Sequence, residues 1–283
     1  MPLNTEDWFT EVAPQDGTAF SLKLKQKVHE EQSSYQRIEI YETEHFGTLM
    51  IIDGCVMLSD RDNFLYHEML THPALFTHPN PQRVLIIGGG DCGTLREVLK
   101  HPSATQVHMV EIDERVTRLA EQYFPELCSA NKDPRAQIHF DDGIQWAADA
   151  EPGSYDVIIV DSTDPVGPAA GLFTAPFYRS CLRALGSDGV FIQQSESPLL
   201  HSGLIKSIHD ELRNAGLANT QLLCFPQPVY PSGWWSATMA SAATPLTRFR
   251  EDAELAMALN TEYYNTDIHR AALATPEFLR KLL

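Results

Sequence analysis

Two aspartates, Asp161 and Asp164, follow the apolar run Val157 to Val160 and precede Pro165. A short apolar run of this kind is typical of a buried parallel strand, which places both carboxylates at its carboxyl end. Ligands of open α/β sheets bind at this edge. Because like charges brought together raise each other's pKa, the pair favours a bound cation or a proton-accepting role. The structural alternative is that one aspartate caps a helix or a turn, since Asp-Pro is a common turn signal.

Acidic residues also follow the other apolar runs that we predict to be strands. The glycine-rich turn Gly88 to Asp91 comes after the first run and before a helix, Glu111 ends the second run, and Asp142 follows the third. Glycines allow the backbone to approach a ligand closely, and an acid at the end of the second strand can bind ribose hydroxyls. The pattern predicts a nucleoside site at the carboxyl edge of a parallel sheet.

The glycine-rich turn alone does not separate nicotinamide, flavin and sulfonium cofactors. A pyrophosphate is doubly anionic and would be repelled by Asp91, Asp161 and Asp164. Loops that bind phosphate present backbone N–H groups without a facing carboxylate. A nucleoside with a positive sulfonium suits this acidic site better, as in class I methyltransferases, whose sheet has the same order of motifs.

Composition limits the possible functions. The chain has 283 residues, 43% hydrophobic and 21% charged, and a formal net charge of −17, which argues against nucleic-acid or anionic-membrane binding. Its five cysteines lack CxxC spacing, so we expect reduced thiols and neither a disulfide framework nor a metal site. An acidic amino-terminal segment and the lack of a long apolar stretch predict a cytoplasmic protein.

The first part of the chain predicts a small antiparallel β-unit of roughly 60 residues. Asp53-Gly54 lies between apolar runs and indicates a hairpin. Residues 1–35 show no clear pattern. A helix is expected over Asn63 to Leu75, with Pro73 kinking or ending it.

The rest of the chain alternates apolar runs with helical stretches, which predicts a parallel sheet with helices on both faces. Gln221 to Phe225 and Trp234 to Ala240 are expected as a later, antiparallel edge. We therefore predict an α/β protein with an N-terminal β-domain over residues 1–72 and a Rossmann-like, class I methyltransferase-like domain over residues 73–283.

Several motifs together are similar to those of the polyamine aminopropyltransferases, the spermidine synthase family. They run in order over nearly the whole chain: Tyr35-Gln36, Phe46-Gly47, Asp53-Gly54, Tyr66-His67-Glu68-Met69, Val84 to Asp91, Leu95 to Val98 with His101, Asp161 to Pro165, Tyr230 to Gly233, Tyr263 to Asn265 and His269. The resemblance implies transfer of an aminopropyl group from decarboxylated S-adenosylmethionine, a co-substrate, to putrescine, without a cofactor. It also implies assembly as a homodimer or homotetramer.

The resemblance also implies residue roles. Donor contacts are expected from Gln36, Gly88, Gly90, Asp91, Glu111, Asp142, Gly143 and Pro168. Amine contacts are expected from Tyr66, His67, Asp91, Asp161, Ser162, Thr163, Asp164, Gln194 and Tyr230, and Glu196 is a further candidate for the far ammonium. Tyr66 has the alternative of a core side chain, and Glu68 and Asp60 to Asp62 that of a solvated acidic face.

The chemistry is consistent with these roles. An alkyl amine is protonated at neutral pH and must lose a proton before it can attack, and Asp161 is the expected base. Cys92, Met57 and Asn63 depart from the family pattern, which puts one polar donor contact in doubt. An amine N-methyltransferase, a non-catalytic polyamine- or nucleoside-binding protein and a nicotinamide dehydrogenase are the alternatives, and the length of the acceptor amine stays open.

Overall fold

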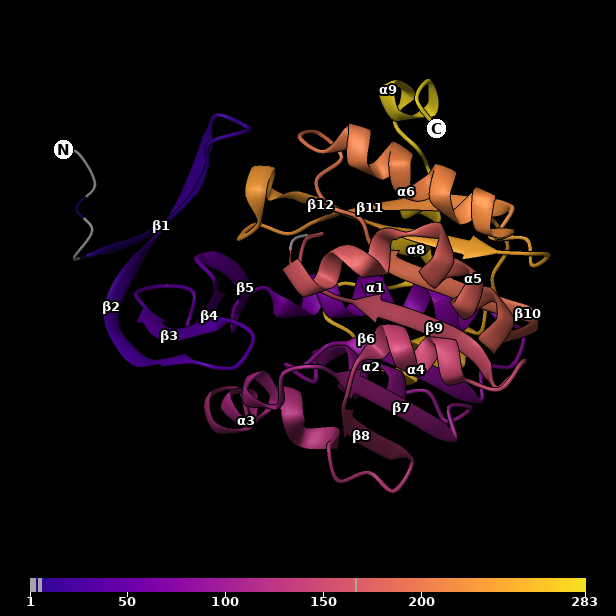
Figure 1. Ribbon diagram of the computed structural model, residues 1–283, viewed down its shortest axis with the longest axis horizontal. Coiled ribbons are helices and arrows are strands. Elements are labelled where there is room, and N and C mark those ends of the chain that lie inside the picture. Colours follow the sequence, from indigo (N-terminus) through magenta and orange to yellow (C-terminus); the bar gives the residue numbers. More distant parts are fainter. Residues whose placement is uncertain (1–3, 5–6, 166) are drawn as a thin grey trace.

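The computed structural model describes residue 4, residues 7–165 and residues 167–283, without the side chains of Pro168 and Ala253. Two sheets organise the chain, a small one at the left of Figure 1 and a larger one flanked by helices. Within this described part, no helix is both long enough and apolar enough to cross a bilayer.

The small sheet is an antiparallel meander of five strands in chain order. Its strands are β1 (Trp8–Ala13), β2 (Thr18–Gln32), β3 (Arg37–Thr43), β4 (Thr48–Ile52) and β5 (Cys55–Ser59). The predicted β-unit is therefore confirmed. Asp53 and Gly54 turn the chain between β4 and β5 with φ of 50° and 87°, the left-handed values of a tight hairpin turn.

The segment without a clear pattern, residues 1–35, contains β1 and β2. These strands pair as a long hairpin from Trp8↔Lys23 to Ala13↔Thr18. Most of their side chains are half-buried or exposed, so neither face carries the regular apolar alternation from which a strand is predicted.

The large sheet has seven strands in the order β11-β12-β10-β9-β6-β7-β8. They are β6 (Arg83–Gly88), β7 (Gln106–Glu111), β8 (Ala136–Phe140), β9 (Tyr155–Asp161), β10 (Leu185–Gln194), β11 (Asn219–Pro226) and β12 (Trp234–Ser241). The pairs among β6 to β10 are parallel, whereas β12 is antiparallel to β10 and β11. The Rossmann-like sheet and its antiparallel edge are as predicted.

Helices cover both faces of the large sheet (Figure 1). They are α1 (Asn63–Thr77), α2 (Gly93–Leu99), α3 (Glu114–Tyr123), α4 (Gly143–Asp149), α5 (Ala175–Ala184), α6 (Ser202–Ala215), α7 (Ala253–Ala258), α8 (Thr266–Ala272) and α9 (Glu277–Arg280). Three 3-10 segments complete the elements, η1 (Leu127–Ala130), η2 (Gly167–Phe173) and η3 (Pro231–Gly233). Val84 and Ile86 pack toward α1 and α2, whereas Leu85 and Ile87 pack toward α4 to α6.

Two features of this fold prepare the site. The chain leaves β6 toward β7 on one side and later returns through β9 on the other, so the strand order reverses between β6 and β9. Ligands of such sheets bind at this switch point, outside the carboxyl ends of the strands. α3 packs on the small sheet, where Val116 and Leu119 meet Ile38, Ile40 and Met50, and this contact holds the N-terminal sheet beside the switch point.

Helix α1 departs from expectation at its end. It continues through Pro73 to Thr77 instead of stopping near residue 75. Nearly the whole helix is buried, and Leu70, Leu75 and Phe76 pack in the core beneath the large sheet. Burial of these side chains stabilises the last turn despite the backbone hydrogen bond that proline cannot donate.

Candidate functional site

A large cavity lies at the carboxyl ends of β6, β7 and β9, with an open space of about 1040 Å³ including its mouth. This size is at the upper end for small-molecule sites. Of the predicted donor residues, the following line the cavity: Gln36, Gly88, Gly90, Asp91, Glu111, Asp142 and Gly143. Pro168 belongs to η2, and its side chain lies outside the described part of the structure.

Close backbone approach explains two of the glycines. Gly88 has φ of 83°, and a Cβ there would lie 2.1 Å from the carbonyl oxygen of Asp161 on the neighbouring strand. A Cβ at Gly93 would lie 2.2 Å from Cε1 of His67. Glycine at these positions lets β9 and the imidazole of α1 approach the glycine-rich turn.

Glu111 ends β7 and is 8% exposed. Its Oε1 accepts a hydrogen bond of 2.8 Å from the backbone N–H of Asp113. Burial, with smaller contributions from the Asp113 and Asp161 carboxylates, raises the pKa of Glu111 to about 7. A buried carboxylate at the end of the second strand of such a sheet is suited to accept hydrogen bonds from ribose hydroxyls.

Gln36 and Asp142 reach the cavity from different domains. The Gln36 amide comes from the N-terminal sheet and donates a hydrogen bond of 3.0 Å to Asp113, the N-cap residue of α3. Asp142 caps α4 by accepting from the backbone N–H of Ile144 at 2.8 Å. The N-terminal domain is thus part of the cavity wall.

Asp161 lies at the end of β9 and receives two hydroxyl hydrogen bonds. Tyr66 donates to Oδ1 at 2.8 Å, and Thr94 donates to Oδ2 at 2.6 Å. Burial and the nearby Asp91 carboxylate raise the pKa of Asp161, against the opposing effects of His67 and of the two hydroxyls. The carboxylate is therefore fixed in orientation and more basic than an exposed aspartate, as a general base requires.

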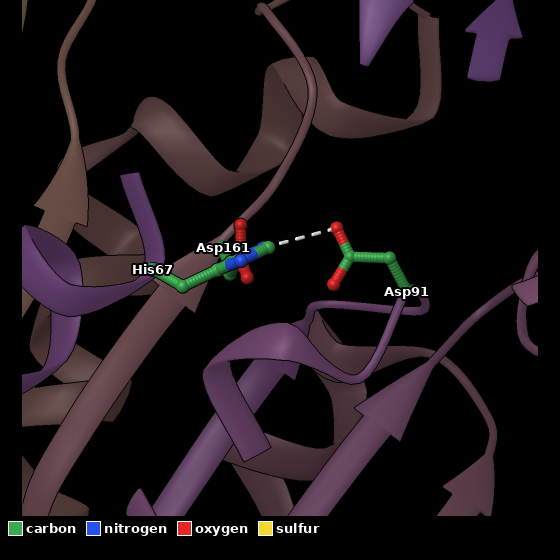
Figure 2. Close-up of side chains that lie close together, drawn as sticks. All are labelled: His67, Asp91 and Asp161. Atoms are coloured by element: carbon green, nitrogen blue, oxygen red, sulfur yellow. Dashed lines mark hydrogen bonds and ion pairs between the residues drawn. The ribbon is translucent and has the colours of Figure 1, made fainter. Parts of the chain in front are cut away.

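His67 projects from α1 toward Asp91, which follows β6 (Figure 2). Its Nε2 lies 3.2 Å from Oδ2 of Asp91. Burial lowers the pKa of His67 and raises that of Asp91, but their mutual contact outweighs burial in both, so the pKa of His67 is raised and that of Asp91 is lowered. The two side chains form an imidazolium–carboxylate pair.

His67, Asp91 and Asp161 offer ligand atoms that all lie within 4.8 Å of one another. Such a cluster could hold a metal ion, and it suits an organic ammonium equally well, because both are cations that need carboxylate oxygens. That no metal takes part stays a prediction.

A second, smaller cavity adjoins the first on the side of β10 and β12. It is lined by predicted amine residues, Tyr66, Ser162, Thr163, Asp164, Gln194 and Tyr230, and by Trp235. Tyr66, Ser162, Thr163 and Tyr230 also line the large cavity, so the two cavities share a wall next to Asp161.

Hydrogen bonds fix this shared wall. The Tyr230 hydroxyl donates to the carbonyl oxygen of Met57 at 2.6 Å, and the Gln194 amide donates to that of Thr163 at 3.4 Å. The Tyr66 ring is 6% exposed and packs against the rings of Tyr230 and Phe225. Tyr66 is thus both a core side chain and a site residue, which joins the two interpretations of the sequence.

Three carboxylates gather at the end of the second cavity away from Asp161. Glu11 of β1 and Asp164 line it, and the Glu196 carboxylate lies beside Asp164. Partial removal of water from its carboxyl group and the neighbouring Glu196 carboxylate raise the pKa of Asp164, but the residue as a whole is exposed, so the remaining water weakens the effect. Burial also raises the pKa of Glu11.

Sequence reasoning missed Thr94 and Glu11. Thr94 lies in the first turn of the helix after the glycine-rich turn. Nothing in the local sequence indicates that its hydroxyl faces Asp161 at the end of β9. Glu11 lies in the segment without a clear pattern. Only the tertiary arrangement brings either side chain to the site.

Glu68 and Asp62 are not part of a solvated acidic face, as the alternative interpretation had it. Glu68 is 1% exposed and accepts hydrogen bonds from the backbone N–H groups of residues 262 to 264, at 2.7 to 2.9 Å. Asp62 is 3% exposed and accepts from Ser59 at 2.6 Å. Both carboxylates fasten the segments around the site.

Cys92 is fully buried at the start of α2, with φ of 69°. Its thiol donates to the carbonyl oxygen of Gly90 at 3.6 Å. The neighbouring Cys128 thiol and burial hold the pKa of Cys92 far above its ordinary value, so this thiol is a structural part of the turn and not a reactive one.

Comparison with known proteins agrees with this geometry. Residues 63–251 match the family model described as the spermine/spermidine synthase domain, and residues 7–60 match the spermidine synthase tetramerisation domain. A polyamine aminopropyltransferase from Methylococcus capsulatus is 64% identical over 275 residues, 97% of this chain and 96% of that protein. One from Thioalkalivibrio sulfidiphilus is 63% identical, covering 98% and 97% of the two chains.

Solved structures show the same relationship. A spermidine synthase in complex with the transition-state analogue AdoDATO superposes with a TM-score of 0.92 at 38% identity, covering 98% of this chain and 95% of that one. Spermidine synthase from Thermotoga maritima gives a TM-score of 0.89, also at 38% identity, covering 97% and 93%.

The fold and the site are those of a group-transfer enzyme with a nucleoside-type donor. The chain belongs to the spermine/spermidine synthase family. It is an aminopropyltransferase of the spermidine synthase class, the enzymes that form spermidine by aminopropyl transfer.

Proposed function

We propose that the chain transfers the aminopropyl group of decarboxylated S-adenosylmethionine to putrescine, giving spermidine and 5′-methylthioadenosine. The observation that carries the proposal is the position of Asp161 beside the wall shared by the two cavities. A donor in the large cavity and an amine in the small one meet at its carboxylate.

The large cavity has the chemistry that the donor needs. Glu111 and Asp142 accept hydrogen bonds from the nucleoside, and Gln36, Gly88, Gly90, Gly143 and Pro168 complete its binding site. Asp91 faces the ammonium of the decarboxylated propyl chain. The same carboxylate repels the carboxylate of intact S-adenosylmethionine, so Asp91 selects the decarboxylated donor by charge.

Asp161 acts as the base. It accepts a proton from the attacking nitrogen as that nitrogen forms a bond to the carbon next to sulfur. The carbon–sulfur bond breaks, its electron pair stays on sulfur, and methylthioadenosine leaves as a neutral thioether. No acid is needed for this departure, so positioning of amine and donor supplies most of the remaining rate.

The small cavity holds the rest of the diamine. Tyr66, His67, Ser162, Thr163 and Tyr230 surround the attacking end, where Tyr66 and Thr163 line the cavity wall. At the far end, Asp164 and Gln194 accept the second ammonium, with Glu11 and Glu196 beside them. The imidazolium beside them, His201 next to Glu196, cannot balance three carboxylates, which supports a diamine over a neutral or anionic acceptor.

An amine N-methyltransferase has the same kind of sheet and is the second candidate, but its donor carries a carboxylate that Asp91 would repel. Family membership and the shared fold make a non-catalytic binding protein the weaker alternative.

We further propose assembly as a homodimer or homotetramer, since residues 7–60 match a tetramerisation domain. A cytoplasmic location is consistent with five free cysteines in the chain. A domain boundary after residue 72 stays a prediction.

One assay tests the reaction. Purified protein is incubated with decarboxylated or intact S-adenosylmethionine and with putrescine, cadaverine, agmatine or spermidine, and methylthioadenosine is measured. We expect release with the decarboxylated donor and putrescine, unchanged by EDTA. Equal turnover of the intact donor to a methylated amine would refute the proposal.

A further inference from the structure

The N-terminal hairpin of β1 and β2 extends beyond the rest of the small sheet toward the large domain (Figure 1). Its tip contains Asp16, whose carboxylate lies 3.0 Å from Nε2 of His201. His201 is the N-cap residue of α6. One imidazole therefore joins two segments that are 185 residues apart in the sequence.

The other nitrogen of the same ring faces Glu196, the carboxylate beside Asp164 of the acceptor cavity. Nδ1 of His201 lies 2.9 Å from Oε2 of Glu196, and the Glu196 side chain is 3% exposed. The two atoms lie within ion-pair distance, but they are not aligned for a hydrogen bond. The contacts with Glu196 and Asp16 raise the pKa of His201 to about 9, against the effect of burial, so the ring is cationic at neutral pH.

Glu196 needs this support because its backbone is strained. Its φ is 69°, a left-handed conformation that is unfavourable for a residue with a side chain. The Ser236 hydroxyl donates to the Glu196 carbonyl oxygen at 2.8 Å, and the Glu196 N–H donates to Gln194 at 3.1 Å. These bonds fix the backbone, and the imidazolium holds the carboxylate.

The hairpin in turn carries Glu11 into the acceptor cavity. Glu11 accepts a hydrogen bond of 2.7 Å from the backbone N–H of Val56, which ties the middle of the hairpin to β5. The tip is tied to the large domain through Asp16. If the tip detached, Glu11 would keep only its contact with the small sheet.

We propose that His201 is a positioning residue of the acceptor site, which fastens the hairpin tip to the segment that carries Glu196 and so holds the acidic end of the cavity together. The inference rests on the proposed function of that cavity. The positive charge of His201 partly balances the negative charge of Glu196. The acidic end of the cavity then keeps a net negative charge that suits one ammonium rather than a longer polycation. His201 contributes to acceptor affinity and not to the chemical step.

The test compares three variants with the wild type. His201→Gln removes the cation, Asp16→Asn keeps the pair with Glu196 but weakens the tie to the hairpin, and His45→Gln is a matched control, since His45 is 77% exposed in its side chain. Steady-state rates are measured with putrescine and with 1-aminobutane, which lacks the second ammonium. Hydrogen exchange is measured over residues 8–24.

We expect His201→Gln to raise the putrescine KM by about tenfold, because the loss of the partly buried contacts with Glu196 and Asp16 lets both carboxylate-bearing segments move, an effect that outweighs the removed repulsion between His201 and the ammonium; kcat and donor KM should be nearly unchanged. The preference for putrescine over 1-aminobutane should fall by a similar factor. Hairpin exchange should be faster in His201→Gln and in Asp16→Asn, with a smaller rise in KM in Asp16→Asn. His45→Gln should match the wild type in every measurement.

Two results would overturn this inference while leaving the proposed function intact, provided that the wild type has normal activity. One is an unchanged putrescine KM in His201→Gln, and the other is unchanged hairpin exchange in both His201→Gln and Asp16→Asn. A wild-type protein that releases no methylthioadenosine from the decarboxylated donor and putrescine would overturn the proposed function and this inference with it. If His201→Gln does not fold, Asp16→Asn alone decides through its hairpin exchange and its KM.

Discussion

Replacing Asp161 by asparagine tests the assignment of the base. Asparagine has nearly the same shape, and its amide oxygen can still accept a hydrogen bond from Tyr66 or Thr94, which hold Asp161 at 2.8 and 2.6 Å. The substitution removes the group that accepts a proton and little else. Donor binding should change little, because Glu111 and Asp142 lie elsewhere in the large cavity.

The expected loss follows from the acidity of the amine. An alkylammonium has a pKa of about 10.4, so only about one molecule in 10³ is neutral near pH 7.4. Without a base, only this fraction can attack, and kcat should fall by about 10³-fold, within the range of about 10²–10⁴ for general bases. Each rise of one pH unit should increase the kcat of Asp161→Asn about tenfold, until the amine is largely neutral.

The assay is the pH–rate profile of methylthioadenosine release between pH 7 and 10 with saturating donor. Asp164→Asn is the matched control, because it removes a carboxylate from the same loop and should raise the putrescine KM with a smaller effect on kcat. Near-normal kcat of Asp161→Asn at pH 7, or a low rate that does not rise with pH, would show that the base lies elsewhere.

Three further predictions concern groups around this base. Burial raises the pKa of Glu111 to about 7, so donor affinity should weaken as the pH falls below 7. Calorimetry at pH 6 and pH 8 should show this difference in the wild type, whereas Glu111→Gln should bind the donor more weakly at both pH values and without that pH dependence. Thr94→Val removes a hydrogen bond that lowers the pKa of Asp161, so the acid limb of the pH–rate profile should move to higher pH, and Thr94→Ser should restore it; an unmoved limb would contradict the role of Thr94. Glu68→Gln should lower the free energy of unfolding by about 2–4 kcal/mol, since hydrogen bonds to a charged acceptor are worth about 1.5–3 kcal/mol each and are partly kept by the amide; chemical denaturation with unchanged stability would refute this.

The meeting of Asp91, Glu111 and Asp161 could be predicted because their positions depend on the sheet alone. Each follows an apolar run, and parallel strands bring their carboxyl ends to one edge. The structure places β9 beside β6 with Gly88 opposite Asp161. A local pattern thus determined a tertiary neighbourhood, since the order of strands in such sheets is restricted.

Residues whose partners lie far along the chain could not be assigned in this way. Glu68 stands beside polar residues on a helix and suggests a solvated face, yet its hydrogen-bond partners are about 195 residues away. Glu11 lies in a hairpin whose half-exposed strands give no apolar periodicity. In both cases the sequence shows the charge, but only the packing shows what the charge faces.

The excess of acidic groups in the site has a cost for folding and a use in binding. Burial raises the pKa of Glu11, Glu111, Asp161 and Asp164, so each carboxylate costs stability once the pH rises above the ordinary pKa of a carboxyl group. The imidazolium of His67 holds the pKa of Asp91 below its ordinary value but offsets only part of the rise in the pKa of Asp161, so the site as a whole keeps an excess of acidic groups. A protein retains such charges where a ligand neutralises them, and the aminopropyl donor and the diamine are both cations. In the mechanism that we propose, the acidity that opposes folding of the enzyme without its substrates is therefore the same property that binds both substrates and prepares Asp161 to accept the proton.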